Sequence, residues 1–339
     1  MMPSHRQGLS IVAPETVAAH WVPKLRQEAE VVVQLTHQGR TAPMQTDKEA
    51  DPEVQRGFEE EYALAGAVDG IDLIVAGHTD HGLQTPVRHP KTQTLIVETF
   101  GQGMHLGVLN LRYQAGEPLT VLSSDLVPVN ADALPSDATV LDLIETARSE
   151  HPALAAVVGA LAGHAPRKYY RESVVGNLVA DALRAYAKTD IGMITPGALR
   201  SDLASGPVTV EQIRNVFPFL DRVSTVRLTG AVLKEVVRKG LRREYGLPQY
   251  SGLTLTAELE KPEGNRLISI KINNLPDIDA KVYTLATGSF TATGGEGYHL
   301  LTPHVVGTSE ALVSEVLVAY FESKGCLLYT SPSPRDVEE

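Results

Sequence analysis

Short apolar runs alternate with longer stretches of helical spacing in the first third of the chain. The runs at 31–35, 71–76 and 94–99 have the length and β-branched content of buried strands. Between the first two runs, the polar and acidic stretch 52–67 has the spacing of a helix. Residues 107–113 alternate apolar and polar positions, which is typical of a half-exposed strand. This order of strands and helices predicts an α/β layer structure.

A second pattern begins after residues 127–135, which are rich in Pro, Asp and Asn and indicate a domain boundary. Residues 139–161 carry apolar positions at helical spacing and predict a long connecting helix. We therefore expect three parts, at 1–130, 131–166 and 167–324. The last is expected to be a mixed α/β domain with helices at 176–188, 210–215 and 230–244, and strands near Ile191, Ser224, Leu253, Ile268 and Tyr283.

Composition narrows the classes of function. The 339 residues, 43% of them hydrophobic, are enough for two domains with separate cores. A net charge of −11 disfavours a nucleic-acid polymer as partner, because its phosphates would be repelled. No apolar run approaches the roughly 20 residues that cross a bilayer, so no membrane span is expected.

The end of the chain has a different character. Cys326 is the single cysteine, which excludes a disulfide framework and a thiolate-rich zinc site. From residue 325 the sequence reads GCLLYTSPSPRDVEE, without apolar periodicity and with two Ser-Pro steps. We interpret 325–339 as a non-native tail, and the alternative is a native disordered tail.

Two histidines follow the first two predicted strands. His37 comes after 31–35, and His78 comes after 71–76 with Asp80 two positions later. If the strands are parallel, their carboxyl ends meet at one sheet edge, where α/β enzymes gather ligands. Imidazole and carboxylate together suit zinc, manganese or iron. The alternative, polar loop residues without a ligand role, is left open by these residues alone.

The segments LTHQG (35–39) and AGHTD (76–80) resemble the last two metal-ligand motifs of calcineurin-like metallophosphoesterases, in particular the bacterial 5′-nucleotidase and UDP-sugar hydrolase family. The resemblance implies that His37, His78 and Asp80 are metal ligands, with His81 as a rival to Asp80. The family's earlier motifs, including its catalytic histidine, have no counterpart in residues 1–30. The resemblance therefore implies an internal start, with the catalytic histidine upstream, and inactivity of this chain alone.

A longer resemblance covers most of residues 171–301. RESVVGNLVADA (171–182) is similar to the opening motif of the same family's C-terminal domain, although read alone its Gly-Asn pair is simply a helix start. TPGALR (195–200) is similar to the family's Asn-x-Gly-Gly-x-Arg loop, with Thr195 in place of Asn. The resemblance implies that Arg171 and Arg200 contact substrate. Arginine suits this role because it presents a permanently charged fork of donors.

Two phenylalanines fall on the family's base-stacking positions. FPF (217–219) and FTATGGEGY (290–298) are similar to two further motifs, which implies that Phe219 and Phe290 clamp a nucleobase between their rings. Glu296 stands where the family usually has Asp, and ribose or base contact is implied for it. The alternative for each phenylalanine is a place in the hydrophobic core.

The resemblance implies an α/β (α+β) fold in which part of a metallophosphoesterase sandwich precedes a mixed α/β 5′-nucleotidase C-terminal domain. It implies hydrolysis of nucleoside 5′-phosphates with two divalent metal ions, Zn, Mn or similar, as cofactors. It also implies a periplasmic, secreted or cell-surface location for the full-length protein. The alternatives are hydrolysis of UDP-sugars or cyclic nucleotides and, from another class, a non-catalytic nucleoside-binding module.

Overall fold

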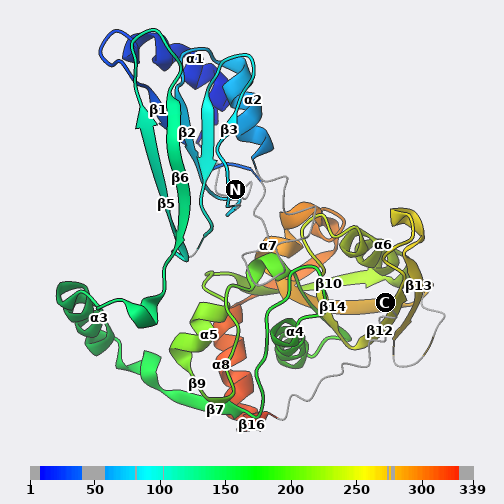
Figure 1. The fold of residues 1–339 in the computed structure, drawn as a ribbon. Coiled ribbons are helices and arrows are strands. Elements are labelled where there is room, and N and C mark those ends of the chain that lie inside the picture. The colour runs from blue at the N-terminus through cyan, green and yellow to red at the C-terminus, as the bar shows by residue number, and fades with distance from the viewer. Residues whose placement is uncertain are drawn as a thin grey trace. The chain divides into compact units, whose positions relative to one another are not determined.

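The computed structural model describes residues 8–39, 58–80, 82–101, 103–272, 275 and 279–327. These residues form two compact units, which we call the first unit (8–137) and the second unit (138–327). In Figure 1 the first unit runs from blue to blue-green and the second from green to red. No helix among the described residues is long and apolar enough to cross a membrane.

A four-stranded sheet organises the first unit, with the strand order β1-β2-β4-β3. Strands β1 (Val33–Leu35), β2 (Leu73–Ala76) and β4 (Leu95–Glu98) are parallel, and β3 (Val87–Arg88) is antiparallel to β4. Helix α2 (Glu59–Ala67) lies between β1 and β2 in the sequence. The three parallel strands confirm the sequence prediction for 31–35, 71–76 and 94–99.

Alternating side chains of β2 and β4 supply two separate cores, as the period of two in a strand requires. Ile74 and Ile96 face α2 and helix α1 (Pro14–Leu25). Leu73 and Leu95 face the other way and pack with residues of β5 (His105–Arg112) and β6 (Thr120–Pro128), an antiparallel hairpin. The sheet thus lies between a helical layer and a hairpin, which Figure 1 shows for the first unit. A short 3-10 helix, η3 (Ala131–Ala133), follows β6.

A five-stranded mixed sheet organises the second unit, in the order β11-β8-β14-β10-β15. Its strands are β8 (Ile191–Ile194), β10 (Arg222–Thr229), β11 (Gln249–Ser251), β14 (Val282–Gly288) and β15 (Val305–Leu312). Two smaller sheets accompany it. One is the hairpin of β12 (Leu253–Ala257) and β13 (Leu267–Ile272), and the other joins β7 (Val157–Leu161), β9 (Gly206–Thr209) and β16 (Cys326–Leu327).

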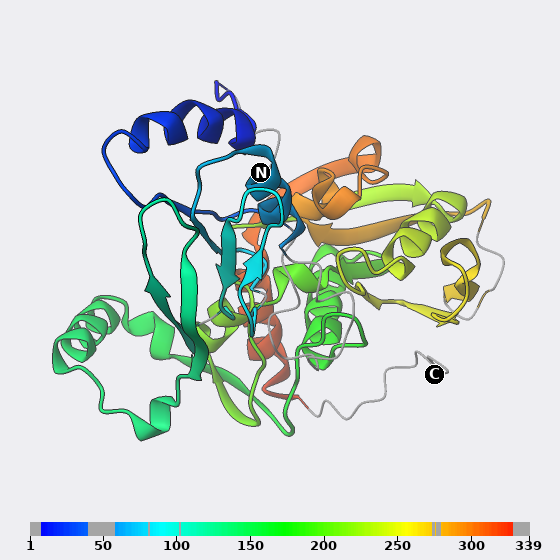
Figure 2. The same ribbon diagram turned by 45° about the horizontal axis from the view of Figure 1, so that its top comes forward.

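Helices cover the large sheet of the second unit and divide its interior into two clusters. Helices α4 (Val174–Ala187), α5 (Val210–Val216) and α8 (Val313–Lys324) contribute to the first cluster, and α4 packs against α8 in both views (Figures 1 and 2). Helix α6 (Gly230–Leu241) and the hairpin β12–β13 contribute to the second. The short helix α7 (Ser289–Ala292) follows β14 directly. The 3-10 helices are η4 (Pro152–Ala155), η5 (Pro196–Ala198), η6 (Glu263–Asn265), η7 (Gly295–Gly297) and η8 (Thr302–His304).

The predicted helix at 139–161 is wrong in its second half. Helix α3 (Ala138–Glu150) ends before Pro152, and 157–161 instead forms β7. The β-branched pair Val157–Val158 and the hydrogen bonds to β9 favour the strand, and tertiary pairing of this kind is not visible in local periodicity. At the other end, Cys326 and Leu327, the second and third residues of the expected non-native tail, pair in parallel with β7.

Candidate functional site

Two imidazoles meet at the carboxyl edge of the first sheet. Leu35 of β1 is opposite Val75 of β2, and the Thr36 N–H extends the ladder by donating to the Val75 carbonyl at 3.0 Å. The residues that follow the two strands therefore leave the sheet side by side. Nδ1 of His78 lies 3.2 Å from Nε2 of His37, and the ring centroids are 4.8 Å apart. We call these two residues the histidine pair.

The spacing of the histidine pair fits a shared cation. Two imidazole nitrogens bound to one tetrahedral zinc at about 2.05 Å lie about 3.3 Å apart. The observed separation of 3.2 Å matches that value. Within the described ranges, however, no group of three or more His, Cys, Asp or Glu side chains is arranged to hold a metal ion. The described residues therefore offer two candidate nitrogen ligands, and a complete metal site would need others.

The loop after β2 has an unusual backbone. His78 has a φ of 80° and Asp80 a φ of 57°, values that non-glycine residues rarely adopt. Such conformations cost of order 1–3 kcal/mol and concentrate at functional sites. The Asp80 carboxylate lies over Gly101, where a Cβ would have no space. The roles of Asp80 and His81 as ligands stay predictions, and His81 lies outside the described residues.

Buried carboxylates support both histidine loops. The Thr36 hydroxyl donates to Oε1 of Glu61 on α2 at 3.1 Å, and the Thr79 hydroxyl donates to Oε1 of Glu98 at the end of β4 at 2.5 Å. Burial raises the pKa of Glu61, although hydrogen bonds, including those from Thr36 and Gln38, lower it in part. Neither glutamate was predicted from the sequence. A threonine beside each histidine was the available signal.

In the second unit, the loop 195–200 lies against the FPF segment. It follows β8, and the Arg200 N–H donates to the carbonyl of Val216 at 2.8 Å. The guanidinium Cζ of Arg200 lies 5.3 Å from the centre of the Phe219 ring, which is a cation–π distance. The structure thus brings together two residues that the sequence analysis assigned separately to substrate binding.

Phe219 and Phe290 lie outside the hydrophobic clusters. Their exposed fractions are 41% and 36%, whereas Phe217 is 1% exposed and belongs to the core. Phe217 supports Phe219 edge-on, with ring centroids 5.8 Å apart and planes at 84°. Gly295 lies against the Phe290 ring, leaving no room for a Cβ. The core alternative is therefore wrong for Phe219 and Phe290, which present ring surface to solvent. We call Phe219, Phe290 and Arg200 the aromatic site.

Glu296 is held against the same loop. Its Oε1 lies where a Cβ on Gly197 would be, so this contact requires glycine at 197. Its Oε2 is buried, although the residue as a whole is partly exposed. Burial raises the pKa of Glu296 to about 7, against the opposing effects of Thr195, Arg200 and Lys239.

Two neighbours of Glu296 were not found from the sequence. Burial raises the pKa of Tyr169, and the charge of Glu296 raises it further. Lys239 of α6 pairs with Glu244 at 2.8 Å and contributes positive charge near Glu296. Neither residue lies in one of the motifs. Both are near Glu296 only in the folded chain, so no local signal in the sequence points to them.

Arg171 is exposed, beside the start of α4. Its carbonyl accepts a hydrogen bond from Nε2 of Gln249 at 3.2 Å, which anchors the backbone of the segment. Helix α4 begins at Val174, where the Ser173 hydroxyl accepts from the Gly176 N–H at 3.1 Å. The substrate role of Arg171 stays a prediction.

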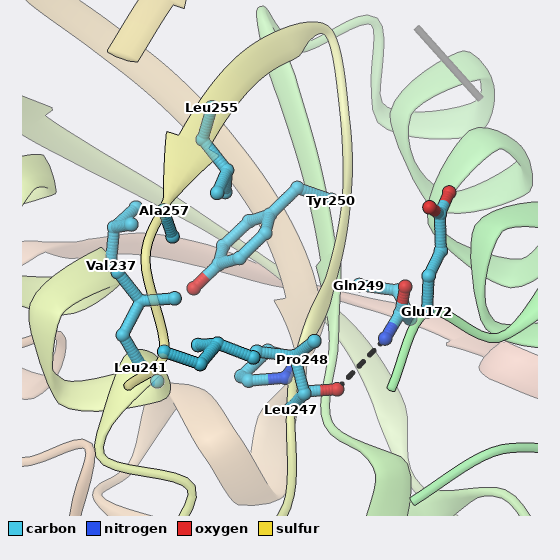
Figure 3. Close-up of a pocket in the computed structure, with 11 residues that line it drawn as sticks. Glu172, Val237, Leu241, Leu247, Pro248, Gln249, Tyr250, Leu255 and Ala257 are labelled. Carbon is cyan, nitrogen blue, oxygen red and sulfur yellow. Dashed lines mark hydrogen bonds between the residues drawn. The ribbon is translucent and has the colours of Figure 1, made fainter. Parts of the chain in front are cut away.

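A small pocket in the second unit is unsuited to a nucleotide. Its cavity volume is about 30 Å³, and mostly apolar side chains from α6 and the 247–259 segment line it (Figure 3). Figure 3 also shows the hydrogen bond of 2.8 Å from Gln249 Nε2 to the Leu247 carbonyl. Small-molecule sites typically have several hundred Å³, so this pocket is too small to hold a nucleotide.

Comparison with known proteins finds similarity to 5′-nucleotidases. Residues 153–303 match the family described as 5′-nucleotidase, C-terminal domain. The trifunctional nucleotide phosphoesterase YfkN of Bacillus subtilis is 28% identical over 270 residues, covering 73% of this chain and 18% of that protein. The snake venom 5′-nucleotidase of Macrovipera lebetinus is 24% identical over 293 residues, covering 72% of this chain and 71% of that protein.

The fold has a close counterpart among solved structures. A 5′-nucleotidase precursor from Thermus thermophilus superposes with a TM-score of 0.79 at 21% sequence identity, covering 96% of this chain and 68% of that one. The sequence match lies in the second unit, whereas the likeness in fold extends over nearly the whole chain. Residues 153–303 are thus similar to the C-terminal domain of 5′-nucleotidases, and the chain has the fold of a solved 5′-nucleotidase.

Proposed function

We propose that this chain is part of a metal-dependent hydrolase of nucleoside 5′-phosphates. The second unit would bind the nucleoside at the aromatic site, and the histidine pair would supply two ligands to a metal centre. The observation that carries the proposal is the 3.2 Å separation of His37 and His78, in a chain whose residues 153–303 match the 5′-nucleotidase C-terminal domain.

Five residues of the chain have a defined part in this proposal. The neutral nitrogens of His37 and His78 would hold metal, and two divalent ions, Zn, Mn or similar, would supply a hydroxide and charge stabilisation at phosphorus. Phe219 and Phe290 would stack on the base. Arg200, whose Cζ lies 5.3 Å from the Phe219 ring centre, would donate to ribose or phosphate oxygens.

The chemistry of the aromatic site supports a nucleoside without selecting one base. Stacking contributes about 1–3 kcal/mol per base and tolerates every base, because each has a π face. Glu296, with a pKa raised to about 7, can accept a hydrogen bond when ionised and donate one when protonated. A ribose hydroxyl suits both states of this carboxyl group.

Two alternatives have specific support. The relative in Bacillus subtilis is named a trifunctional nucleotide phosphoesterase, which favours further phosphoesters such as UDP-sugars or cyclic nucleotides as substrates. A non-catalytic nucleoside-binding module is favoured by the exposed rings of Phe219 and Phe290, which can stack on a base without a metal centre. For the full-length protein we propose a periplasmic, secreted or cell-surface location, supported by the venom 5′-nucleotidase among its relatives.

Phosphate release from adenosine 5′-monophosphate by the full-length product of the gene tests the proposal. We expect turnover with Mn²⁺ or Zn²⁺ and its loss in a chelator. Chromatography of the products should show slower hydrolysis of UDP-glucose to UMP and glucose 1-phosphate, and of cyclic adenosine monophosphate to adenosine monophosphate. Faster hydrolysis of either of these substrates would support the first alternative. Adenosine binding without turnover by the full-length product would support the binding module.

A further inference from the structure

One carboxylate joins the segment of Phe219 to the segment of Phe290. Asp221 lies two residues after Phe219, immediately before β10. Its Oδ1 accepts a hydrogen bond from the Phe290 N–H at 2.9 Å and another from the Ser289 hydroxyl. Thus the two rings of the aromatic site, 71 positions apart by number, are connected through a single side chain.

Three further contacts fix this junction. The Asp221 carbonyl accepts from the Val313 N–H at 2.9 Å, which ties the segment to the start of α8. The Arg222 N–H donates to the Ser289 hydroxyl oxygen at 3.2 Å. Gly288 lies so close to Oδ2 of Asp221 that a Cβ there would have no space. The carboxylate therefore occupies a fitted position between β10 and α7.

The contacts of Asp221 hold the segments that carry Phe219 and Phe290, which the pairing of β10 and β14 does not reach. The strands β10 and β14 are already aligned by their ladder, in which Val223 is opposite Gly288. Phe219 precedes β10 and Phe290 follows β14, so both rings lie beyond this ladder. Burial raises the pKa of Asp221, and its hydrogen bonds to Ser289, Phe290 and Arg222 act in the opposite direction. The side chain thus continues the alignment of the two strands into the segments that carry the rings.

We propose that Asp221 is a positioning residue that sets the separation of Phe219 and Phe290 and thereby the affinity for the nucleobase. This inference rests on the proposed nucleoside-binding function of the second unit. Asp221 acts through the two rings and does not itself touch the base. Stacking energy depends on the spacing of the rings, so a loose junction lowers affinity without removing any aromatic surface.

Asp190 provides a matched control. Its Oδ2 also accepts one backbone N–H and one hydroxyl, both from Thr284 and both at 2.8 Å. Asp190 lies before β8 and contacts β14 six residues before Phe290. An Asp190→Ala variant therefore loses the same type of hydrogen bonds from the same strand while leaving the aromatic site untouched.

Calorimetric titration of adenosine and of ribose 5-phosphate into the chain tests the inference. We expect Asp221→Ala to raise the Kd for adenosine about tenfold and Asp190→Ala to change it less than about twofold. Asp221→Asn, whose Oδ1 still accepts both hydrogen bonds, should stay within about threefold of the wild type. Affinity for ribose 5-phosphate, which has no base, should be equal in all four proteins.

The outcomes separate this inference from the function on which it rests. If the wild type binds adenosine and Asp221→Ala binds it equally well, the positioning role of Asp221 is wrong and the nucleoside site stands. If the wild type binds no nucleoside, the proposed function fails and this inference fails with it. If Asp221→Ala does not fold, the same titration is made with Ser289→Ala, which removes one hydrogen-bond donor to the Asp221 carboxylate. We then expect a Kd for adenosine raised about threefold, and unchanged affinity would overturn the inference.

Discussion

Nδ1 of His78 lies 3.2 Å from Nε2 of His37, although 41 positions of sequence separate the two residues. The parallel pairing of β1 and β2 produces this contact, because both histidines follow the carboxyl ends of adjacent strands. Because both histidines belong to the first unit, substitutions there test the proposed metal site without changing the aromatic site of the second unit. It also gives the neighbouring threonines and glutamates a function, since they hold the loops in which the imidazoles stand.

Thr79→Val should destabilise the first unit. The buried Glu98 carboxylate loses the hydroxyl that donates to it at 2.5 Å, and such losses cost about 1–3 kcal/mol. Urea unfolding followed by the fluorescence of Trp21, the single tryptophan, reports on this unit because Trp21 lies in α1. Thr120→Val, an exposed position in β6, should change the free energy of unfolding by less than about 0.5 kcal/mol. Equal stability of both variants would show that the Thr79–Glu98 pair contributes nothing.

Phe219→Ala and Phe290→Ala should each weaken adenosine binding while leaving the fold intact. Each removes one stacking surface worth about 1–3 kcal/mol, and both rings are partly exposed already. Calorimetry should therefore show a Kd raised by about 5-fold or more, with little change in the midpoint of unfolding. Phe217→Ala is the contrasting variant, since this ring is 1% exposed and its loss should cost about 3–5 kcal/mol of stability. A large loss of stability in Phe219→Ala and Phe290→Ala would show that these rings belong to the hydrophobic core.

The stability of the second unit should fall between pH 4.5 and pH 7 because of Glu296. Its folded pKa is about 7 against an ordinary value of 4.5, so over this interval the folded state retains a proton that the unfolded state has lost. The stabilising contribution is complete below pH 4.5 and is lost as the pH rises through 7. The loss should be roughly 1–3 kcal/mol. Urea unfolding by circular dichroism at several pH values should show it in the wild type and not in Glu296→Gln. Parallel pH profiles for both proteins would contradict a raised pKa.

Periodicity was sufficient to predict the strands that precede the two histidines and the helices α4, α5 and α6 of the second unit. The convergence of His37 and His78 followed from strand order, because parallel strands present their carboxyl ends at one edge. The strand at 157–161 was missed because its pairing with β9 is a long-range contact, whereas its apolar spacing also fits a helix. Local pattern and tertiary pairing disagreed there, and pairing determined the structure.

The residues that hold the site residues in place could not be predicted from the sequence alone. Glu61 and Glu98 read as ordinary polar positions, and only the folded chain shows them buried beneath Thr36 and Thr79. Similarly, the role proposed for Asp221 follows from its hydrogen bond with Phe290, which is distant in the sequence. Motifs identify side chains that meet a ligand, while residues that hold those side chains in place are recognised from hydrogen bonds and burial.

Phosphate release from adenosine 5′-monophosphate by the full-length His37→Ala variant is the most direct test of the metal-dependent function. Loss of one imidazole ligand should lower the rate about 100-fold or more, while the Kd for adenosine, set by the second unit, stays unchanged. His20→Ala, an exposed histidine of α1, should hydrolyse at the wild-type rate. Wild-type hydrolysis by His37→Ala would contradict the proposal that the histidine pair holds a catalytic metal.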